Sequence, residues 1–257
     1  MFGNSGGGDG GDLKYSLQFT RASSEYMARS YITPTHSKVF SFSVWLQRSS
    51  TGTNQGIFMN SVDGALFWTT DQINFYLHDT SLGQSGQLTT NATYTNTTSP
   101  YHFVFVCDLT SATATLTGSS SDRMRIYVNG VQVSSFSGTI VPPQTMTPLM
   151  NRASTVNELG RLDTYTNYYL DAKLSRFVFI DGQALDANAF GRYNSAGQWV
   201  SKTVSEISAL ASGTGANNVM LEFNDNSSAS ALGNDNSTKN NDYTVFSLST
   251  SDRSINY

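Results

Sequence analysis

Cysteine, charge and long apolar runs are all scarce in this sequence of 257 residues. It contains 1 cysteine, so no disulfide can form within the chain. Charged residues make up 13% of it, about half of the roughly 25% usual in soluble domains, which argues against a coiled coil or a helical bundle. No apolar run approaches the roughly 18 residues that cross a bilayer, and segment 1–13 lacks the basic and apolar parts of a secretory signal. We therefore expect no insertion into a membrane.

The charge balance and the apolar content narrow the class further. The chain carries 15 Lys and Arg against 19 Asp and Glu, a net charge of −4. It therefore offers no basic field to phosphate backbones, and we expect no nucleic-acid partner. Hydrophobic residues at 38% and aromatic residues at 12% are enough to bury a sizeable core. Ser, Thr, Asn and Gly fill much of the remainder, which is typical of all-β chains with many turns.

The one cysteine, Cys107, lies in the apolar run YHFVFVCD. We interpret it as a small buried side chain, because a nucleophilic thiol needs an accessible, electropositive setting that this run does not offer. A β-rich surface protein without disulfides is typical of folding in a reducing cytoplasm.

Short strand-like runs alternate with turn residues along most of the chain. The run KVFSFSVWL alternates large apolar residues with serine, the period of two that marks a strand with one face on a core. Its apolar positions are Phe40, Phe42, Val44 and Leu46. Trp45 falls on the serine side, where a loop or a second layer can bury it. Many such runs and few helical stretches predict an all-β sandwich or barrel.

The segment RMRIYVNGVQV is the clearest hairpin. Apolar residues alternate with Arg125 and Tyr127 up to Asn129 and Gly130, which supply the positive φ angles of a type I′ turn. Two short helices are predicted as well, at 184–190 and 201–210. In the second helix the residues expected to share a face are Val204, Ile207 and Leu210.

The chain divides into three stretches. Residues 1–12 form a glycine-rich arm that we interpret as a flexible tether. Residues 13–195 form the sandwich. Residues 196–257 are rich in Asn, Ser, Asp and Gly, and we expect them to pack on the same domain, because two strands alone are not stable. The candidate anchoring residues of the arm are Phe2, Asn4 and Asp9.

Residues of common catalytic sites are present, but their spacing does not match the chemistry. A glycosidase needs two carboxylates about 5 to 10 Å apart, and on a strand this means acids at i and i+2 or i+4. No glutamate has such a partner; the glutamates are Glu25, Glu158, Glu206 and Glu222. The histidines are isolated too, although a Ser-His-Asp triad is assembled only in space. We expect no enzymatic activity, and a glycan depolymerase is the remote alternative.

Calcium is an open question, and no other cofactor is expected. Asp and Asn oxygens on sandwich loops are suitable ligands for Ca²⁺, and the run NDNSSASALGNDNSTKNND is rich in both. The spacing of an EF-hand fails there, because Asn240 stands where the sharp turn needs glycine. A solvated or turn-forming loop is the alternative. The candidate metal ligands are Asp163, Asp225 and Asp235.

Tyrosines gather in two polar segments of the chain. A ring face can stack on the apolar face of a sugar, while amides and carboxylates hold its hydroxyl groups. The candidate carbohydrate-binding residues are Tyr165, Tyr168, Tyr169 and Tyr94. The alternative is that these rings cover the edge of a core.

Taken in order, the runs YSLQFTRASSEYM, FSFSVWLQR, YHFVFVCD, RIYVNGVQV and LDAKLSRFVFIDGQALDANAFG resemble the concanavalin A-like, laminin-G-like family. The resemblance covers residues 13–192 and implies a two-sheet antiparallel jelly-roll sandwich. The later run LEFNDNSSASALGNDNSTKNNDYTVFSLS resembles a subgroup found in structural proteins of tailed phages, marine phages among them. Tyr101 and Tyr243 stand where tryptophan is common in these relatives.

The resemblance implies a non-enzymatic protein of a bacteriophage virion surface, either a capsid decoration or a head or tail fibre module. It would be assembled in the host cytoplasm and held to the particle by the arm or by a sheet edge. The expected partners are other capsid or tail proteins and further copies of the chain in a homo-oligomer. The alternative is a tail module that recognises a host surface glycan, and the two roles can coexist.

Overall fold

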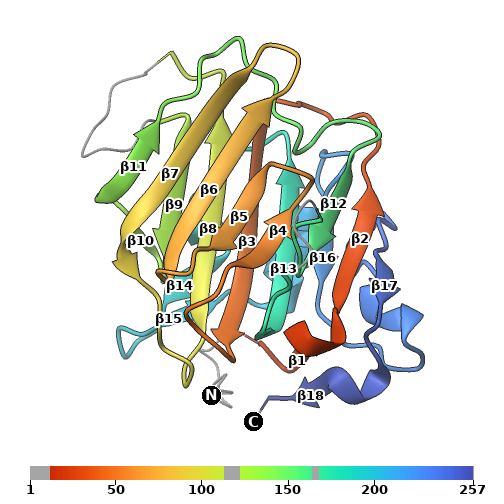
Figure 1. The fold of residues 1–257 in the computed structure, drawn as a ribbon. Coiled ribbons are helices and arrows are strands. Elements are labelled where there is room, and N and C mark those ends of the chain that lie inside the picture. The colour runs from red at the N-terminus through yellow and green to blue at the C-terminus, as the bar shows by residue number, and fades with distance from the viewer. Residues whose placement is uncertain (1–11, 113–121, 164–167, 257) are drawn as a thin grey trace.

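The computed structural model describes residues 12–112, 122–163 and 168–256. Within them the chain forms two large antiparallel sheets that pack face to face (Figure 1). This confirms the predicted all-β, two-sheet jelly-roll sandwich. The predicted residues that lie outside the described ones are Phe2, Asn4, Asp9 and Tyr165.

Each sheet has a strand order that differs from the order along the chain. Across the first sheet lie β10 (Val131–Gln132), β9 (Met124–Val128), β8 (Tyr101–Asp108), β3 (Val39–Arg48), β13 (Ala172–Asp181), β1 (Tyr15–Phe19) and β18 (Arg253–Ile255), with β16 (Val219–Leu221) also paired to β13. Across the second lie β11 (Phe136–Ile140), β7 (Gln84–Thr93), β6 (Gln72–Asp79), β5 (Gly64–Phe67), β4 (Gln55–Met59), β12 (Val156–Leu159), β2 (Tyr26–Ser30) and β17 (Thr244–Phe246). The remaining elements are η1 (Arg21–Ser23), η2 (Ala187–Ala189), β14 (Gly191–Tyr193), β15 (Trp199–Ser201), α1 (Val204–Ala211), η3 (Ser230–Gly233) and η4 (Thr250–Asp252).

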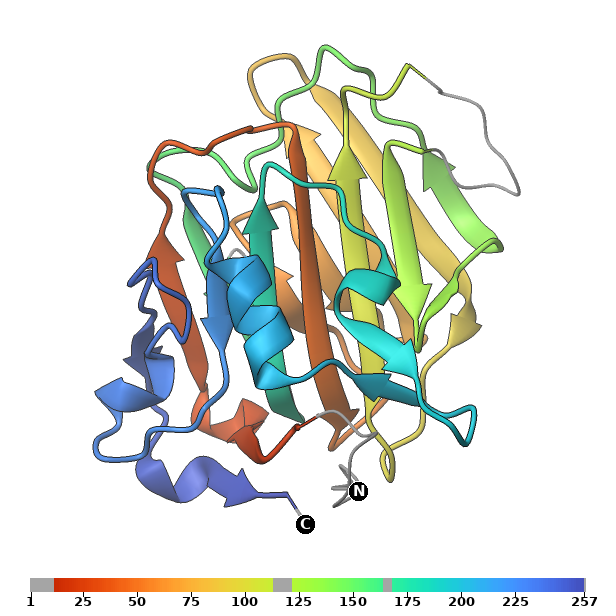
Figure 2. The ribbon, with the colours of Figure 1, turned by 180° about the vertical axis from the view of Figure 1, so that it is seen from behind.

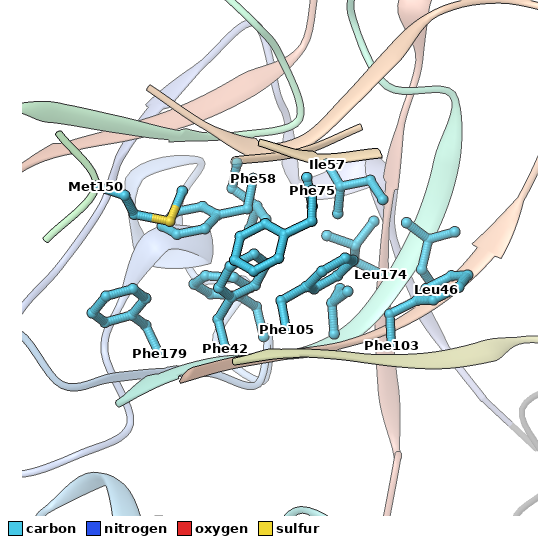
Figure 3. Packing of buried hydrophobic residues seen from close by; sticks show 14 of the residues in the cluster. Phe42, Leu46, Ile57, Phe58, Phe75, Phe103, Phe105, Met150, Leu174 and Phe179 are labelled. Atoms are coloured by element: carbon cyan, nitrogen blue, oxygen red, sulfur yellow. The ribbon is translucent and has the colours of Figure 1, made fainter. Parts of the chain in front are cut away.

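Aromatic side chains fill the space between the sheets (Figure 3). The ring centroid of Phe42 on β3 lies 5.1 Å from that of Phe58 on β4 and 4.7 Å from that of Phe105 on β8. Full burial of one such ring stabilises the fold by about 1.5–3 kcal/mol. The predicted alternation in β3 is confirmed, since this core contains Phe40, Phe42, Val44 and Leu46.

The first sheet is covered on its other face too. Helix α1, the turn η2 and the β14–β15 hairpin lie over it (Figure 2) and bury a second apolar cluster. Its members from the sheet include Val104, Val106, Val178 and Ile180. Strands β8 and β13 are therefore buried on both faces, and the serine side of β3 buries Trp45 as expected.

Helix α1 begins later than predicted. Ser201 belongs to β15, and Thr203 caps the helix by accepting a hydrogen bond from the backbone N–H of Glu206. The buried stripe consists of Ile207 and Ala211, while Val204 points outward. The predicted face is confirmed for Ile207, which is buried, and for Leu210, which packs against the second apolar cluster, but not for Val204, which lies in the exposed first turn. In segment 184–190 only the single turn η2 forms.

The part of the chain after residue 195 adds strands to both sheets: β16 pairs with β13, β17 with β2 and β18 with β1. One edge of β16 has no neighbouring strand in the sheet, and the Asn/Asp-rich run forms hydrogen bonds with the backbone of β16 along that edge. Asp235 Oδ1 accepts the N–H of Met220 at 2.9 Å, and the N–H of Asn236 donates to the Met220 carbonyl at 2.7 Å. These contacts satisfy backbone groups that an unpaired edge strand would leave open.

The carboxylate of Asp181, at the end of β13, joins three segments of chain at one end of the sandwich. It is fully buried and accepts five hydrogen bonds of 2.7–3.2 Å. The donors are the backbone N–H groups of Thr35, His36, Ala216 and Asn217 and the side-chain amide of Asn151. A buried charge is tolerated only when it is hydrogen-bonded in this way.

The β9–β10 hairpin has the predicted turn. Asn129 and Gly130 have φ angles of 48° and 85°, as a type I′ turn requires. The backbone of Gly130 also lies against the indole of Trp199 on β15, and a Cβ at Gly130 would stand 2.4 Å from that ring. Glycine is therefore needed at this position both for its φ angle and for the close approach of Trp199.

We expect Gly130→Ala to lower the free energy of unfolding by clearly more than the roughly 1–2 kcal/mol that a left-handed non-glycine residue costs. The excess comes from displacement of Trp199. Gly197→Ala is the matched control, because Gly197 has φ 74° and nothing within 4 Å of its would-be Cβ. Urea unfolding of both variants measures the difference. Equal losses would show that Trp199 does not constrain the turn.

Candidate functional site

The second sheet carries a groove on its outer face, lined by residues of β2, β12 and β17 and of the chain next to them. These three strands lie at the right of Figure 1. Helix α1 packs on the first sheet and does not cover this face. The groove has a volume of about 530 Å³. Its apolar lining is Ile32, Val156 and Phe246, and its polar lining includes Asn240, Asp242 and Thr244. We call it the β2–β17 groove.

The apolar residues of the groove are exposed because of the strand period. Side chains alternate along a strand, so Tyr26, Ala28 and Ser30 of β2 point away from the core that holds Met27. Ile32 and Val156 are 56% and 49% exposed, and Phe246 is 37% exposed. These three apolar side chains are therefore accessible to a ligand on the outer face of the sheet.

Three side chains stack beside the groove. The guanidinium carbon of Arg161 lies 3.7 Å from the ring centroid of Tyr26, and Tyr26 lies 4.4 Å from Phe246 with parallel rings. Tyr26 and Phe246 are direct cross-strand neighbours on β2 and β17. Cation–π and ring stacking contacts together hold the ring of Phe246 in one orientation.

A second, smaller hollow adjoins the groove, and Val156 lines both. Its volume is about 280 Å³. Its polar lining is Asn60, Ser61, Ser154, Thr155, Glu158 and Asp163. We call it the Glu158 hollow.

Two carboxylates of the Glu158 hollow share one arginine. Arg161 donates to both oxygens of Glu158 at 2.7 and 2.5 Å and lies 2.9 Å from Asp163 Oδ1. Burial raises the pKa of the Glu158 carboxyl above its ordinary value, and the Arg161 hydrogen bonds oppose that shift. The Asp163 side chain is 60% exposed, so its carboxylate remains open to solvent. The trio carries one net negative charge when both acids are ionised.

The predicted tyrosines lie in different places. Tyr169 is next to the site, with its ring 6.2 Å from Tyr26 and a side-chain hydrogen bond to Arg161. Tyr168 packs against the apolar cluster of Met59, Leu66 and Leu162 on the same sheet face.

Tyr94 differs from the expectation of an exposed ring. It is only 7% exposed and packs edge-on against Tyr101 and Phe103 at the margin of the core. The alternative interpretation, a ring that covers a core edge, describes it better.

The three predicted calcium ligands are not gathered at one point. Asp163 contacts Arg161, and Asp225 accepts the N–H of Ser227. Both oxygens of Asp235 are used within the chain, since they accept hydrogen bonds from Met220, Ser237 and Asn241. Among the described residues no group of three or more His, Cys, Asp or Glu is placed to hold a metal ion. A role for these three aspartates in calcium binding stays a prediction.

Ser43 and His102 form a pair that resembles a nucleophile and its base, with 2.8 Å between Oγ and Nε2. Trp199 donates its indole N–H to His102 Nδ1 at 2.9 Å, so the ring proton is on Nε2. An Nε2 that carries the proton donates to Ser43 and cannot take a proton from it. Both residues are also buried, with Trp45 stacked on the imidazole at 4.5 Å. The pair is suited to holding the β14–β15 hairpin in place.

The comparisons with known proteins agree with the fold. Residues 21–188 match the model of the concanavalin A-like lectin/glucanases superfamily. A comparison with curated protein sequences gave no match. In the described part of the chain, no helix is long and apolar enough to cross a membrane.

Solved structures with a similar fold are remote in sequence. A heptameric SAP-like pentraxin from Limulus polyphemus is 11% identical, with 67% of this chain and 78% of the pentraxin covered and a TM-score of 0.47. Domains LG4-5 of the mouse laminin alpha1 chain are 11% identical, with 67% and 43% covered and a TM-score of 0.46. The sialidase NanB from Streptococcus pneumoniae is 13% identical, with 72% and 29% covered and a TM-score of 0.44. These similarities are too remote to bear on function.

Two buried groups give the chain opposite responses to pH. Burial raises the pKa of Asp63, which accepts the backbone N–H groups of His78 and Met150, to about 7. Burial, with Arg176 nearby, lowers the pKa of His102 to about 3. In the pH range between 4 and 6.5, folded Asp63 holds a proton that the unfolded chain loses, whereas folded His102 lacks a proton that the unfolded chain gains.

We therefore expect the contributions of Asp63 and His102 to the pH dependence of stability to cancel in the native chain. A variant that lacks one of the two groups should show the contribution of the other. In Asp63→Asn the remaining His102 makes stability rise with pH across this range, by about 1.4 kcal/mol per unit. In His102→Gln the remaining Asp63 makes stability fall with pH by a similar amount. Urea unfolding at three pH values measures the slope of the free energy of unfolding against pH in each variant. Subtracting one slope from the other removes the contribution of the carboxylates that both variants contain. Parallel slopes would contradict the assignment.

Proposed function

Because this chain belongs to the concanavalin A-like lectin/glucanases superfamily, we propose that it is a non-enzymatic, glycan-binding module displayed on the surface of a phage particle. The observation that carries the binding part is the β2–β17 groove. It combines an oriented, partly exposed aromatic ring with amide and carboxylate groups on an open sheet face.

The chemistry of the groove suits a sugar. The exposed part of Phe246 and the side chain of Val156 offer apolar contact to a pyranose ring, while Asn240 and Asp242 offer hydrogen-bonding groups to its hydroxyls. Its volume of about 530 Å³ lies within the roughly 300–1,000 Å³ usual for small-ligand sites. The adjoining Glu158 hollow adds room for a further unit.

The site is formed before any ligand arrives. Phe246 is fixed by its stack on Tyr26, and Ile32 is fixed by a two-way hydrogen bond between its backbone and the side-chain amide of Asn217. A site that is already ordered loses less conformational entropy on binding, which favours the weak glycan contacts of a lectin.

Two features favour binding without catalysis. Glu158 accepts hydrogen bonds from Arg161 with both of its oxygens, whereas the acid of a glycosidase needs an oxygen that can give a proton to the leaving group. The Ser43–His102 pair has the wrong tautomer for a base. A glycan depolymerase is therefore the less favoured alternative.

The placement on a virion rests on the sequence. The run from residue 221 to 249 resembles a segment of tailed-phage structural proteins, and in this chain that run supplies β17, which joins the second sheet and carries Phe246. On the particle we propose contacts with capsid or tail proteins and with further copies of the chain, and a host surface glycan as the ligand.

Substitution of Phe246 tests the binding site. We expect Phe246→Ala to weaken binding to oligosaccharides on a glycan array by at least about tenfold, equivalent to about 1.4 kcal/mol, because the stacking surface is lost. Phe246→Leu keeps an apolar side chain and should lose most of the affinity as well. Tyr193→Ala, at an exposed ring on the β14–β15 hairpin over the other sheet, is the control and should bind normally.

Unchanged binding by both Phe246 variants would contradict the site, and so would an equal loss in the control. The same incubations report on catalysis. Release of new reducing ends from a bound polysaccharide would show that the protein is a depolymerase and contradict the proposed non-enzymatic function.

A cryo-EM map of phage particles that carry this gene tests the placement. We expect density for the sandwich on the particle surface with the β2–β17 groove facing outward. Density over the capsomers would indicate a decoration, and density at the tail tip would indicate receptor recognition. Absence of the chain from purified particles, measured by mass spectrometry, would overturn the virion assignment and leave the binding site untouched.

A further inference from the structure

We propose that the Glu158 hollow selects sugar units that carry a free amine or no charge and rejects acidic sugars. The inference rests on the proposed glycan-binding function and adds the class of ligand to it. Two observations support it: acidic side chains outnumber basic ones around the hollow, and the acids line the hollow whereas Arg161 is not among its described lining residues.

The acids face the hollow and their counter-ion faces away. Glu158 and Asp163 line it, whereas Arg161 is not among its described lining residues. The guanidinium of Arg161 lies over the ring of Tyr26, where its face is covered, and its hydrogen bonds go to the two acids. A ligand in the hollow therefore meets mainly the exposed carboxylate of Asp163, because both oxygens of the buried Glu158 accept from Arg161.

The charges are also unequal. One arginine pairs with two carboxylates, and the Asp163 side chain is 60% exposed with oxygen lone pairs still open to a donor. A sugar ammonium or hydroxyl group can donate to such an oxygen. A sugar carboxylate or sulfate has no proton to donate and is repelled by like charge.

Neighbouring cations do not reverse this balance. Arg29 at the groove binds Asn241, stacks on Tyr31 at 4.9 Å and is matched in charge by Asp242. Arg152 donates to the Thr147 carbonyl at 2.6 Å and lies 3.8 Å from Asp79. The groove and the hollow together thus keep one excess negative charge.

The remaining lining of the hollow fits the same ligands. Ser154 and Thr155 contribute hydroxyl groups to the lining, and the volume of about 280 Å³ is small. It falls just below the roughly 300–1,000 Å³ of ordinary small-molecule sites, which suits a single sugar ring at the end of a chain that crosses Val156.

The test compares oligosaccharides of different charge on the whole protein. The probes are oligomers of glucosamine, oligomers of N-acetylglucosamine, a neutral glucan and a polyuronate, measured by calorimetry at two salt concentrations. We expect the glucosamine oligomer to bind at least tenfold more tightly than the polyuronate, with the neutral sugars between them. Added salt should narrow the difference, because exposed charges are screened.

The substitution Asp163→Asn assigns the effect to the hollow. The side chain is exposed, so the variant should fold normally, and it should reduce the ratio of glucosamine to polyuronate affinity at least threefold. Asp186→Asn is the matched control, an exposed aspartate beside η2 on the other sheet, whose cap on Asn188 an asparagine can keep. It should leave the ratio unchanged.

The outcomes separate this inference from the function on which it rests. Polyuronate that binds as tightly as the glucosamine oligomer would overturn the inference and leave glycan binding in place. If the expected ratio of glucosamine to polyuronate affinity is found but Asp163→Asn leaves it unchanged, or Asp186→Asn changes it equally, the selectivity does not come from the Glu158 hollow. Failure of every sugar to bind would overturn the proposed function itself, and the inference with it.

Discussion

The buried carboxylate of Asp181 is the interaction on which the arrangement of the binding face depends. Its five hydrogen bonds tie the loop after β2, the chain around Asn151 and the turn before β16 to the end of β13. Asn217, one of its donors, in turn holds the backbone of Ile32 in both directions. A rigid charged centre inside the sandwich thereby fixes the position of an apolar residue on its surface.

The two sheets differ in how much of their outer face is covered. Strands β8 and β13 of the first sheet are buried on both faces, against the aromatic core and under α1 with the β14–β15 hairpin (Figure 2). The second sheet shares the core but leaves the outer face around β2 and β17 open. Because β3, β8 and β13 supply much of the buried apolar surface, residues on the open face can serve binding without supporting the fold.

The strands were predictable from the sequence because the period of two and the Asn129–Gly130 turn are local patterns. The family resemblance added the two-sheet arrangement. The site was only partly predictable. Tyr169, predicted to bind carbohydrate, and Asp163, predicted to bind a metal ion, both lie beside the candidate site. Phe246 was missed, because its contact with Tyr26 is set by the pairing of β17 with β2. The alternation of β2 was the available signal, since it places Tyr26, Ala28 and Ser30 on one face. The outward position of Val204 on α1 shows the same limit, since only packing decides which residues turn inward.

The pairing of β17 with β2 also bears on the order of events during synthesis. A ribosome releases the chain from its N-terminus, so β2 emerges well before Phe246. An unfinished chain has Tyr26 and most of the core but no partner ring for the groove. Under the proposed function, affinity for sugar therefore arises only after β17 has emerged and paired with β2.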